Sequence, residues 1–161
     1  MTAIMAFIGC FAGIYVIAIP TVLDVPASTK IFLIGSFGAS AALLFGAPHA
    51  PLAQPRSLVG GQVIAAFCGV TAFKLLGGDV GAAAALAVAA ATAGMLLSGT
   101  LHPPAGATAL IAVLGPAQVH ALGYLYICTP VLVGVLVLLG FALLINNLST
   151  EKHRHYPLSW W

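Results

Sequence analysis

The chain has 161 residues, of which 61% are hydrophobic and 5% are charged, and its formal net charge is +2. A soluble domain carries roughly a quarter charged residues, so this composition excludes a water-soluble globule, a disordered chain and a collagen-like chain. A mean hydropathy of +1.13 indicates lipid as the solvent. So few charges also exclude the basic face that binding to nucleic acid requires. We therefore expect membrane lipid, and no nucleic acid, among the partners.

Apolar runs predict an all-α integral membrane protein with four long transmembrane helices and two short ones. A span needs about 20 apolar residues. The long runs cover Thr2–Ile19, Leu58–Leu76, Val80–Thr100 and Leu122–Ile145, and the short runs cover Ile31–Gly46 and Ala105–Leu114. As a helix, the last of these reaches only about 15 Å, half the hydrocarbon thickness. The first run lacks the basic start of a secretory signal, so we expect it to stay in the membrane.

An internal repeat links the two short runs. A shift of 68 residues brings Gly38–Ala41 onto Gly106–Ala109 and Pro48 onto Pro116. The pattern divides one domain, residues 1–146, into similar halves, 1–77 and 78–146, each with a long, a short and a long apolar run. Short hydrophobic segments at matching places in two halves indicate a transport site near the bilayer midplane. Either both short runs enter and return on one side, which gives four spans and two re-entrant half-helices, or the first run crosses and the topology shifts toward an inverted three-plus-three arrangement. Charge does not decide between these alternatives.

Local signals mark the ends of the later helices. Asp79 is well placed as the N-cap of the Ala-rich helix, in which Gly81, Ala85 and Ala89 repeat at a four-residue spacing that allows close helix packing. We expect that helix to lie centrally. Residues 147–161 are predicted to form a cytoplasmic tail, because the tail carries positive charge and its aromatic rings suit the headgroup level.

The sharpest motif begins the second short helix. Prolines belong in a first helical turn, where an N–H would lack a helical partner, and the next amides, from Ala105 to Ala107, are then free to bind an anion. Thr108 adds a hydroxyl group, and Ser36 is predicted to be the N-cap of the first short helix. The expected substrate-binding residues are His102, Pro103, Pro104, Ala105, Gly106, Ala107, Thr108, Ser36, Gly38, Ser40 and Arg56.

Several of these residues also have a purely structural interpretation. The motif at His102 would then only kink and cap a helix, and its imidazole would be a cap instead of a hydrogen-bond donor or proton carrier. Arg56 either attracts the anion or extends to the interface. Three polar residues lie in or near the Pro-rich stretch 47–56, namely His49, Gln54 and Gln62. They line a water-filled path or belong to a loop at the headgroup level.

The sequence lacks the residue patterns that enzymes and metal sites usually need. A site built from His49, His102 and His120 has no carboxylate or thiolate at ligand spacing. The chain contains no GxSxG, HExxH or P-loop motif. The three cysteines lie far apart in apolar runs. We therefore expect no metal, no cofactor and no enzymatic activity.

Ordered blocks over nearly the whole chain resemble the HPP family of integral membrane proteins. The blocks are Gly35–Ala41, Phe45–Pro48, Pro51–Arg56, Gly60–Gly61, Leu101–Ala109, Asn146–Leu148, Arg154, Tyr156–Pro157 and Trp160. The family's name motif falls on His102, Pro103 and Pro104. The resemblance implies a four-span protein of bacterial or plastid type, some of whose relatives are implicated in nitrite transport.

Together these observations predict a transporter or channel for a small inorganic anion, with nitrite as the favoured substrate. The alternatives are a channel for small neutral solutes and a structural subunit of a membrane complex that transports nothing. We expect a multi-pass protein of the inner (plasma) membrane. Because four spans are few for enclosing a path, we also expect a homo-oligomer.

Overall fold

The computed structural model describes residues 2–22, 33–151 and 154–160. Four of its segments are long and apolar enough to cross a membrane. They are α1 (Thr2–Val22), α3 (Pro55–Leu76), α4 (Val80–Ser98), and η3 (Ile127–Leu132) joined to α7 (Val133–Asn147). The shorter elements are α2 (Gly35–Gly46), η2 (Pro51–Ala53), α5 (Ala105–Leu114) and α6 (Ala117–Leu122). The described residues contain no strand, and the predicted all-α membrane fold is confirmed.

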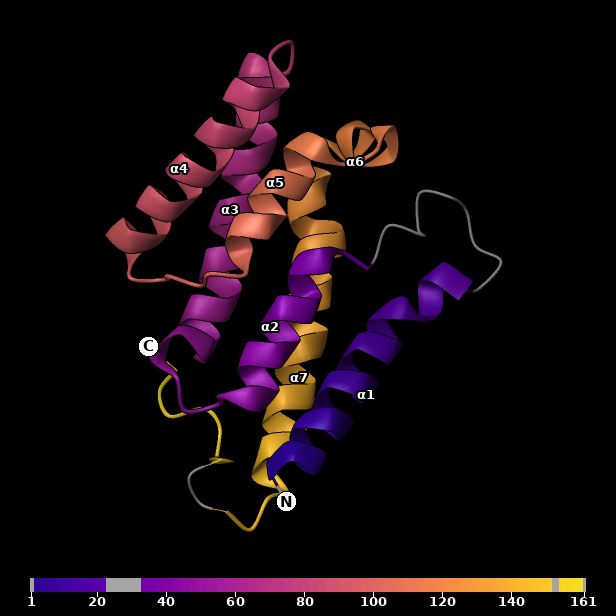
Figure 1. The fold of residues 1–161 in the computed structure, drawn as a ribbon, viewed down its shortest axis with the longest axis vertical. Coiled ribbons are helices and arrows are strands. Elements are labelled where there is room, and N and C mark those ends of the chain that lie inside the picture. Colours follow the sequence, from indigo (N-terminus) through magenta and orange to yellow (C-terminus); the bar gives the residue numbers. More distant parts are fainter. Residues whose placement is uncertain (1, 23–32, 152–153, 161) are drawn as a thin grey trace.

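The two halves of the chain run in opposite directions. In Figure 1, α1 ascends, α2 descends and α3 ascends, whereas α4 descends, α5 ascends and α7 descends. The packing follows the same symmetry, since α1 lies against α2 and α7 while α4 lies against α5 and α3. Of the two arrangements that the repeat allowed, the structure has the inverted three-plus-three one. The short helices α2 and α5 both begin near the middle height of the molecule and point in opposite directions (Figure 1).

Local chemistry explains where α4 begins and ends. Oδ1 of Asp79 accepts a hydrogen bond of 3.0 Å from the amide of Ala82, so the predicted N-cap is present. Gly99 follows the helix with a φ of 65°, the left-handed conformation that glycine adopts at no steric cost. The chain can therefore turn at once into the loop that leads to α5.

The Ala-rich helix α4 lies at the periphery, so the expectation of a central helix was wrong. Figure 1 shows it at one edge of the bundle. The predicted stripe of small residues is exposed, and a second stripe at the same spacing, Ala83, Ala87 and Ala91, packs on the protein instead. Both stripes consist of small residues four positions apart, so spacing alone does not tell which one faces the bundle.

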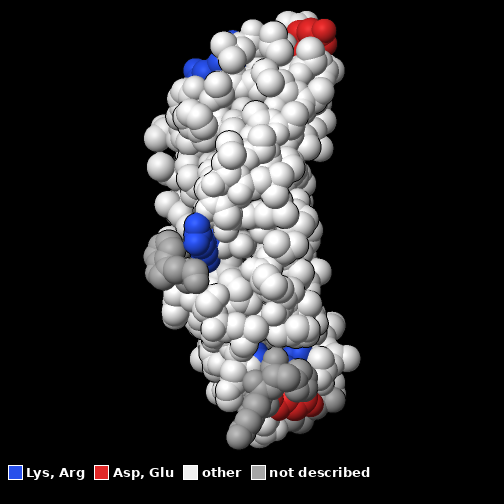
Figure 2. Space-filling view, turned by 90° about the vertical axis from the view of Figure 1, so that its left-hand side faces the viewer, with Lys and Arg blue, Asp and Glu red and all other residues white. Residues whose placement is uncertain are grey.

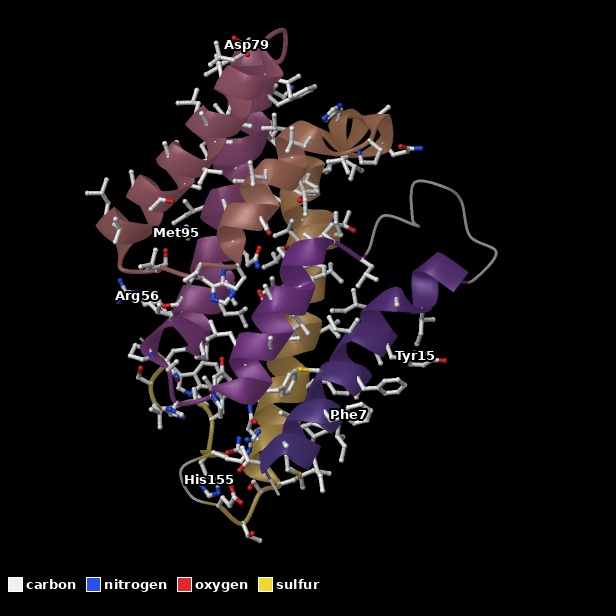
Figure 3. All side chains as sticks on the ribbon, in the orientation of Figure 1. Phe7, Tyr15, Arg56, Asp79, Met95 and His155 are labelled. Atoms are coloured by element: carbon white, nitrogen blue, oxygen red, sulfur yellow. The ribbon has the colours of Figure 1, made fainter. Side chains whose placement is uncertain are left out.

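Charged side chains lie mainly at the two ends of the molecule, as a membrane protein requires. Figure 2 shows acidic and basic groups at the top and bottom of one face and a broad uncharged surface between them, interrupted by one basic patch. The side of α1 away from the bundle carries exposed aromatic rings, among them Phe7 and Tyr15 (Figure 3). This uncharged belt suits contact with lipid.

The C-terminal segment packs onto the end of the bundle where α2 and α7 finish. Arg154 is 1% exposed and donates from Nη2 to the Phe45 carbonyl at 2.9 Å and to Oδ1 of Asn146 at 3.0 Å. The hydroxyl of Tyr156 donates to the Ala53 carbonyl at 2.8 Å. Burial raises the pKa of the Tyr156 phenol, so this group stays a neutral donor. Tyr156 thus packs inside the protein and not against lipid headgroups.

Candidate functional site

Five buried polar side chains meet where the two short helices begin. Ser36, Ser40 and Thr108 are 0% exposed, as is His102, and Gln62 is 1% exposed. They come from α2, α3, α5 and the loop before α5. We call these five residues the central network. A buried polar group without a hydrogen bond is costly. Each of these five side chains therefore needs a hydrogen-bond partner within the protein.

His102 connects the central network to the Pro-rich segment after α2. Its Nδ1 lies 2.8 Å from the carbonyl oxygen of Leu52, and its Nε2 lies 2.8 Å from Oγ of Ser40. A carbonyl oxygen only accepts, so Nδ1 carries the proton and Nε2 of the neutral ring accepts from the Ser40 hydroxyl. Gly61 of α3 makes room for this residue, because a Cβ at Gly61 would lie 2.7 Å from Cβ of His102.

Gln62 joins the two repeats. Its Nε2 donates to Oγ of Ser40 at 3.1 Å, and its Oε1 accepts a hydrogen bond from the hydroxyl of Thr108. Ser40 and Thr108 occupy equivalent positions under the 68-residue shift. Thr108 also lies 2.7 Å from Oγ of Ser36, so its one proton serves two acceptors. The amide of Gln62 therefore bridges the two half-helices.

The expected free amides at the start of α5 are not free. The N–H groups of Ala105, Gly106 and Ala107 donate to the carbonyls of the residues three positions earlier, at 2.9, 3.1 and 3.1 Å. Pro104 already has helical backbone angles (φ −57°, ψ −24°), so the two prolines supply a tight first turn that pairs these amides locally. The anion site built on these three amides is overturned, and the polar side chains beside them take its place.

Three further expected residues lie elsewhere or act differently. Ser36 is not the N-cap, because α2 begins one residue earlier with Ile34 at the cap, and its hydroxyl faces Thr108. Gly38 is exposed on α2, away from the central network.

Arg56 is also exposed, and its Nη2 donates to the Ser98 carbonyl at 2.6 Å. Carbonyls at a helix C-terminus attract cations, which explains why this side chain turns outward to the end of α4 (Figure 3).

Sequence reasoning placed Gln62 only beside a wet path, outside the expected binding residues. A neutral amide in the middle of an apolar helix was the signal that could have identified it, because burial in lipid or protein obliges it to find partners. Gln54, the other glutamine near the Pro-rich stretch, has different hydrogen-bond partners. Gln54 holds the Pro-rich segment and the C-terminal segment, donating to the Pro48 carbonyl and accepting from the amide of Leu158.

Metal binding finds no support in the residues that the structure describes. They contain no group of three His, Cys, Asp or Glu side chains that could hold an ion. Of the three histidines weighed as ligands, His102 uses both ring nitrogens in the central network. His120 lies 3.8 Å from the ring of Phe73, centroid to centroid, and Nε2 of its ring hydrogen-bonds to the Val113 carbonyl.

Comparison with known proteins identifies the family. A family description, HPP, transmembrane region, matches residues 1–157. The chain belongs to the HPP family. Two transmembrane proteins of Dictyostelium discoideum are similar to it: one is 42% identical over 159 residues, which is 97% of this chain and 50% of the relative. The other is 40% identical over 158 residues, 96% of this chain and 54% of the relative.

The chain spans about half the length of these two relatives. No solved structure matches it. The HPP chain is therefore a membrane protein, and the geometry of the central network is the feature from which its activity has to be inferred.

Proposed function

We propose that this HPP protein conducts or transports a small inorganic anion across the membrane through the central network. The observation that carries the proposal is the meeting of two inverted half-helices at five fully buried polar residues. In membrane transporters, polar backbone and side-chain groups at such an interrupted midplane position form the substrate site. Polar groups buried there are expensive, so they are expected to have a function.

The surroundings of the central network support an anionic substrate. The aligned peptide dipoles of α2 and α5 direct their positive ends toward it. The members of the network are neutral, and serine, threonine, glutamine and histidine side chains all offer donors. With no carboxylate among these five residues, an anion meets donors and positive dipole ends, whereas a cation meets the wrong dipole ends.

Nitrite is the proposed substrate. It is a small oxyanion that hydroxyl and amide donors can bind, and the resemblance to the HPP family implies it. The binding residues of this proposal are Ser36, Ser40, Gln62, His102 and Thr108. For Arg56 we propose only that it attracts the anion from outside the central network, because its guanidinium points away from the network.

Reconstitution tests the proposal directly. Purified protein in proteoliposomes should take up nitrite with a current that follows the imposed membrane potential. The Gln62→Leu variant should lose most of that uptake, and Asn146→Leu, which removes a buried amide that is not hydrogen-bonded to the network, should retain it. No flux of any solute in the folded wild-type protein would contradict the proposal and favour a structural subunit.

A second candidate is a channel for small neutral solutes. The observation that favours it is the neutrality of all five network residues, with no cationic side chain to balance a bound anion. Positive dipole ends would then only exclude cations. Flow of uncharged solutes without nitrite current would support this candidate.

The remaining expectations also stay proposals. We propose that the protein has no enzymatic activity and no cofactor, and that it lies in the inner (plasma) membrane with its C-terminal segment on the cytoplasmic side. The expected homo-oligomer stays a prediction, which the mass of the solubilised protein tests.

A further inference from the structure

Two cavities lie next to segments that adjoin the central network, one toward the top of the molecule and one at and below its middle height, on the side where α4 ends (Figure 1 and Figure 3). The upper cavity, of about 690 Å³, is lined by residues at the start of α2, such as Leu33 and Gly35, and by the end of α5 and Val119 of α6. The lower cavity, of about 300 Å³, is lined by Leu101 in the loop before α5, by Pro51 and Leu52 of η2, and by Arg56. In Figure 1, α6 lies near the top and the segment between α2 and α3 lies below the middle.

The repeat relates the two cavities. The 68-residue shift that superposes the half-helices also carries Leu33 onto Leu101 and Pro51 onto Val119. Each cavity therefore lies at the start of one half-helix and beyond the end of the other. Two of the ten lining positions of each cavity thus correspond, as expected where each half of an inverted repeat contributes one access route.

The central network adjoins both linings along the chain, although none of its five residues lines either cavity. Ser36 directly follows Gly35 of the upper lining, and His102 directly follows Leu101 of the lower lining. The carbonyl that holds His102 belongs to Leu52, which also lines the lower cavity. Hydrogen bonds run without interruption from Ser36 through Thr108, Gln62 and Ser40 to His102.

Charge distinguishes the lower cavity from the upper one. Arg56 lines the lower cavity together with Met95, and Figure 3 shows both on the side of the molecule where α4 ends. An arginine between the two ends of a membrane protein is costly, and such residues mark substrate and ion pathways. The lower cavity is therefore suited to collect anions.

We infer that the two cavities are aqueous access routes from opposite sides of the membrane, and that the hydrogen bonds of the central network form the closed gate between them. This inference rests on the proposed permeation through the network, and it adds where the solute enters, where it leaves and what separates the two routes. Opening requires the bridge of Gln62 between Ser40 and Thr108 to part, because it ties one half-helix to the other.

Cysteine accessibility tests the inference without any transported solute. The native cysteines at positions 10, 68 and 128 are first replaced by alanine. Leu33→Cys and Leu101→Cys then probe the two cavities with a charged, membrane-impermeant thiol reagent. Gly78→Cys, at the turn between α3 and α4, and Leu158→Cys, in the C-terminal segment, mark the two ends of the protein.

We expect Leu33→Cys to react from the same side as Gly78→Cys, and Leu101→Cys to react from the side of Leu158→Cys. Reaction of both cavity probes from one side, or of neither, would overturn the inference. Nitrite flux without opposite-sided labelling would support the proposed function and contradict the two access routes. Opposite-sided labelling without flux would support the access routes and contradict the proposed function.

A second measurement addresses the gate. Ser36→Cys, fully buried in the network, should not react from the lower side. Adding Gln62→Ala should make it reactive from that side, whereas adding Asn146→Ala, the matched buried amide, should not. Unchanged protection of the cysteine in the folded Gln62→Ala protein would show that Gln62 does not close the path.

Discussion

Replacing Gln62 by leucine removes the bridge between the two half-helices at nearly constant side-chain volume. The amide is 1% exposed and makes one donated and one accepted hydrogen bond within the central network. Each such bond contributes about 1 kcal/mol net. Ser40 keeps His102 as a partner and Thr108 keeps Ser36, so neither hydroxyl is left alone. We expect the free energy of unfolding to fall by about 2 kcal/mol.

The effect of Gln62→Leu on nitrite uptake should be larger than this loss of stability explains. A hydrogen bond to a charged group contributes about 1.5–3 kcal/mol. Leucine fills the space of the amide, so this variant does not open the path as Gln62→Ala is expected to, and the uptake rate should fall roughly 10- to 150-fold if Gln62 donates to the passing anion. Uptake is measured in proteoliposomes that contain equal amounts of folded protein.

Asn146→Leu is the matched control for Gln62→Leu. Asn146 is also a buried amide with one donated and one accepted bond, to the Leu44 carbonyl and from Arg154. It should lower stability by at least as much while uptake per folded protein stays normal. Equal uptake in Gln62→Leu and in wild-type protein, with both folded, would refute the assignment of the path to the central network.

Three further predictions concern single positions. Gly106→Val should leave nitrite uptake near the wild-type rate, because a Cβ there meets no atom within 4 Å and the nearby amides are already paired; a strong loss of uptake would restore the amide site. Arg154→Leu should lower the unfolding temperature in detergent, since it removes charged hydrogen bonds to Phe45 and Asn146, and an unchanged unfolding temperature would contradict this. Asp79→Ala should cost about 1 kcal/mol through the lost N-cap, with uptake unaffected.

Two differences from the predicted site, the paired amides at the start of α5 and the outward turn of Arg56, have the same physical origin. A half-helix end inside the membrane must satisfy its donors, and α5 does so with its own loop carbonyls instead of a solute. The polar side chains, which also need partners, then face one another across the repeat axis. In the same way the cationic Arg56 finds the carbonyls at the end of α4 and leaves the centre neutral.

Properties that depend on neighbouring residues along the chain are predictable from the sequence. Hydropathy predicted four spans and two short helices, with α5 at Ala105–Leu114 as observed, because the length of an apolar run and the thickness of the bilayer are enough for that inference. The cap at Asp79 follows from local side-chain and backbone chemistry in the same way.

Properties that depend on contacts between distant segments required the folded arrangement. The opposite direction of the halves was undecided because so few charges flank the spans. The bridge by Gln62, the burial of Arg154 against α2 and α7, and the choice between two equally spaced stripes on α4 each depend on which helix lies opposite. A side chain's facing direction is set by its packing partners, and no periodicity within one helix contains that information.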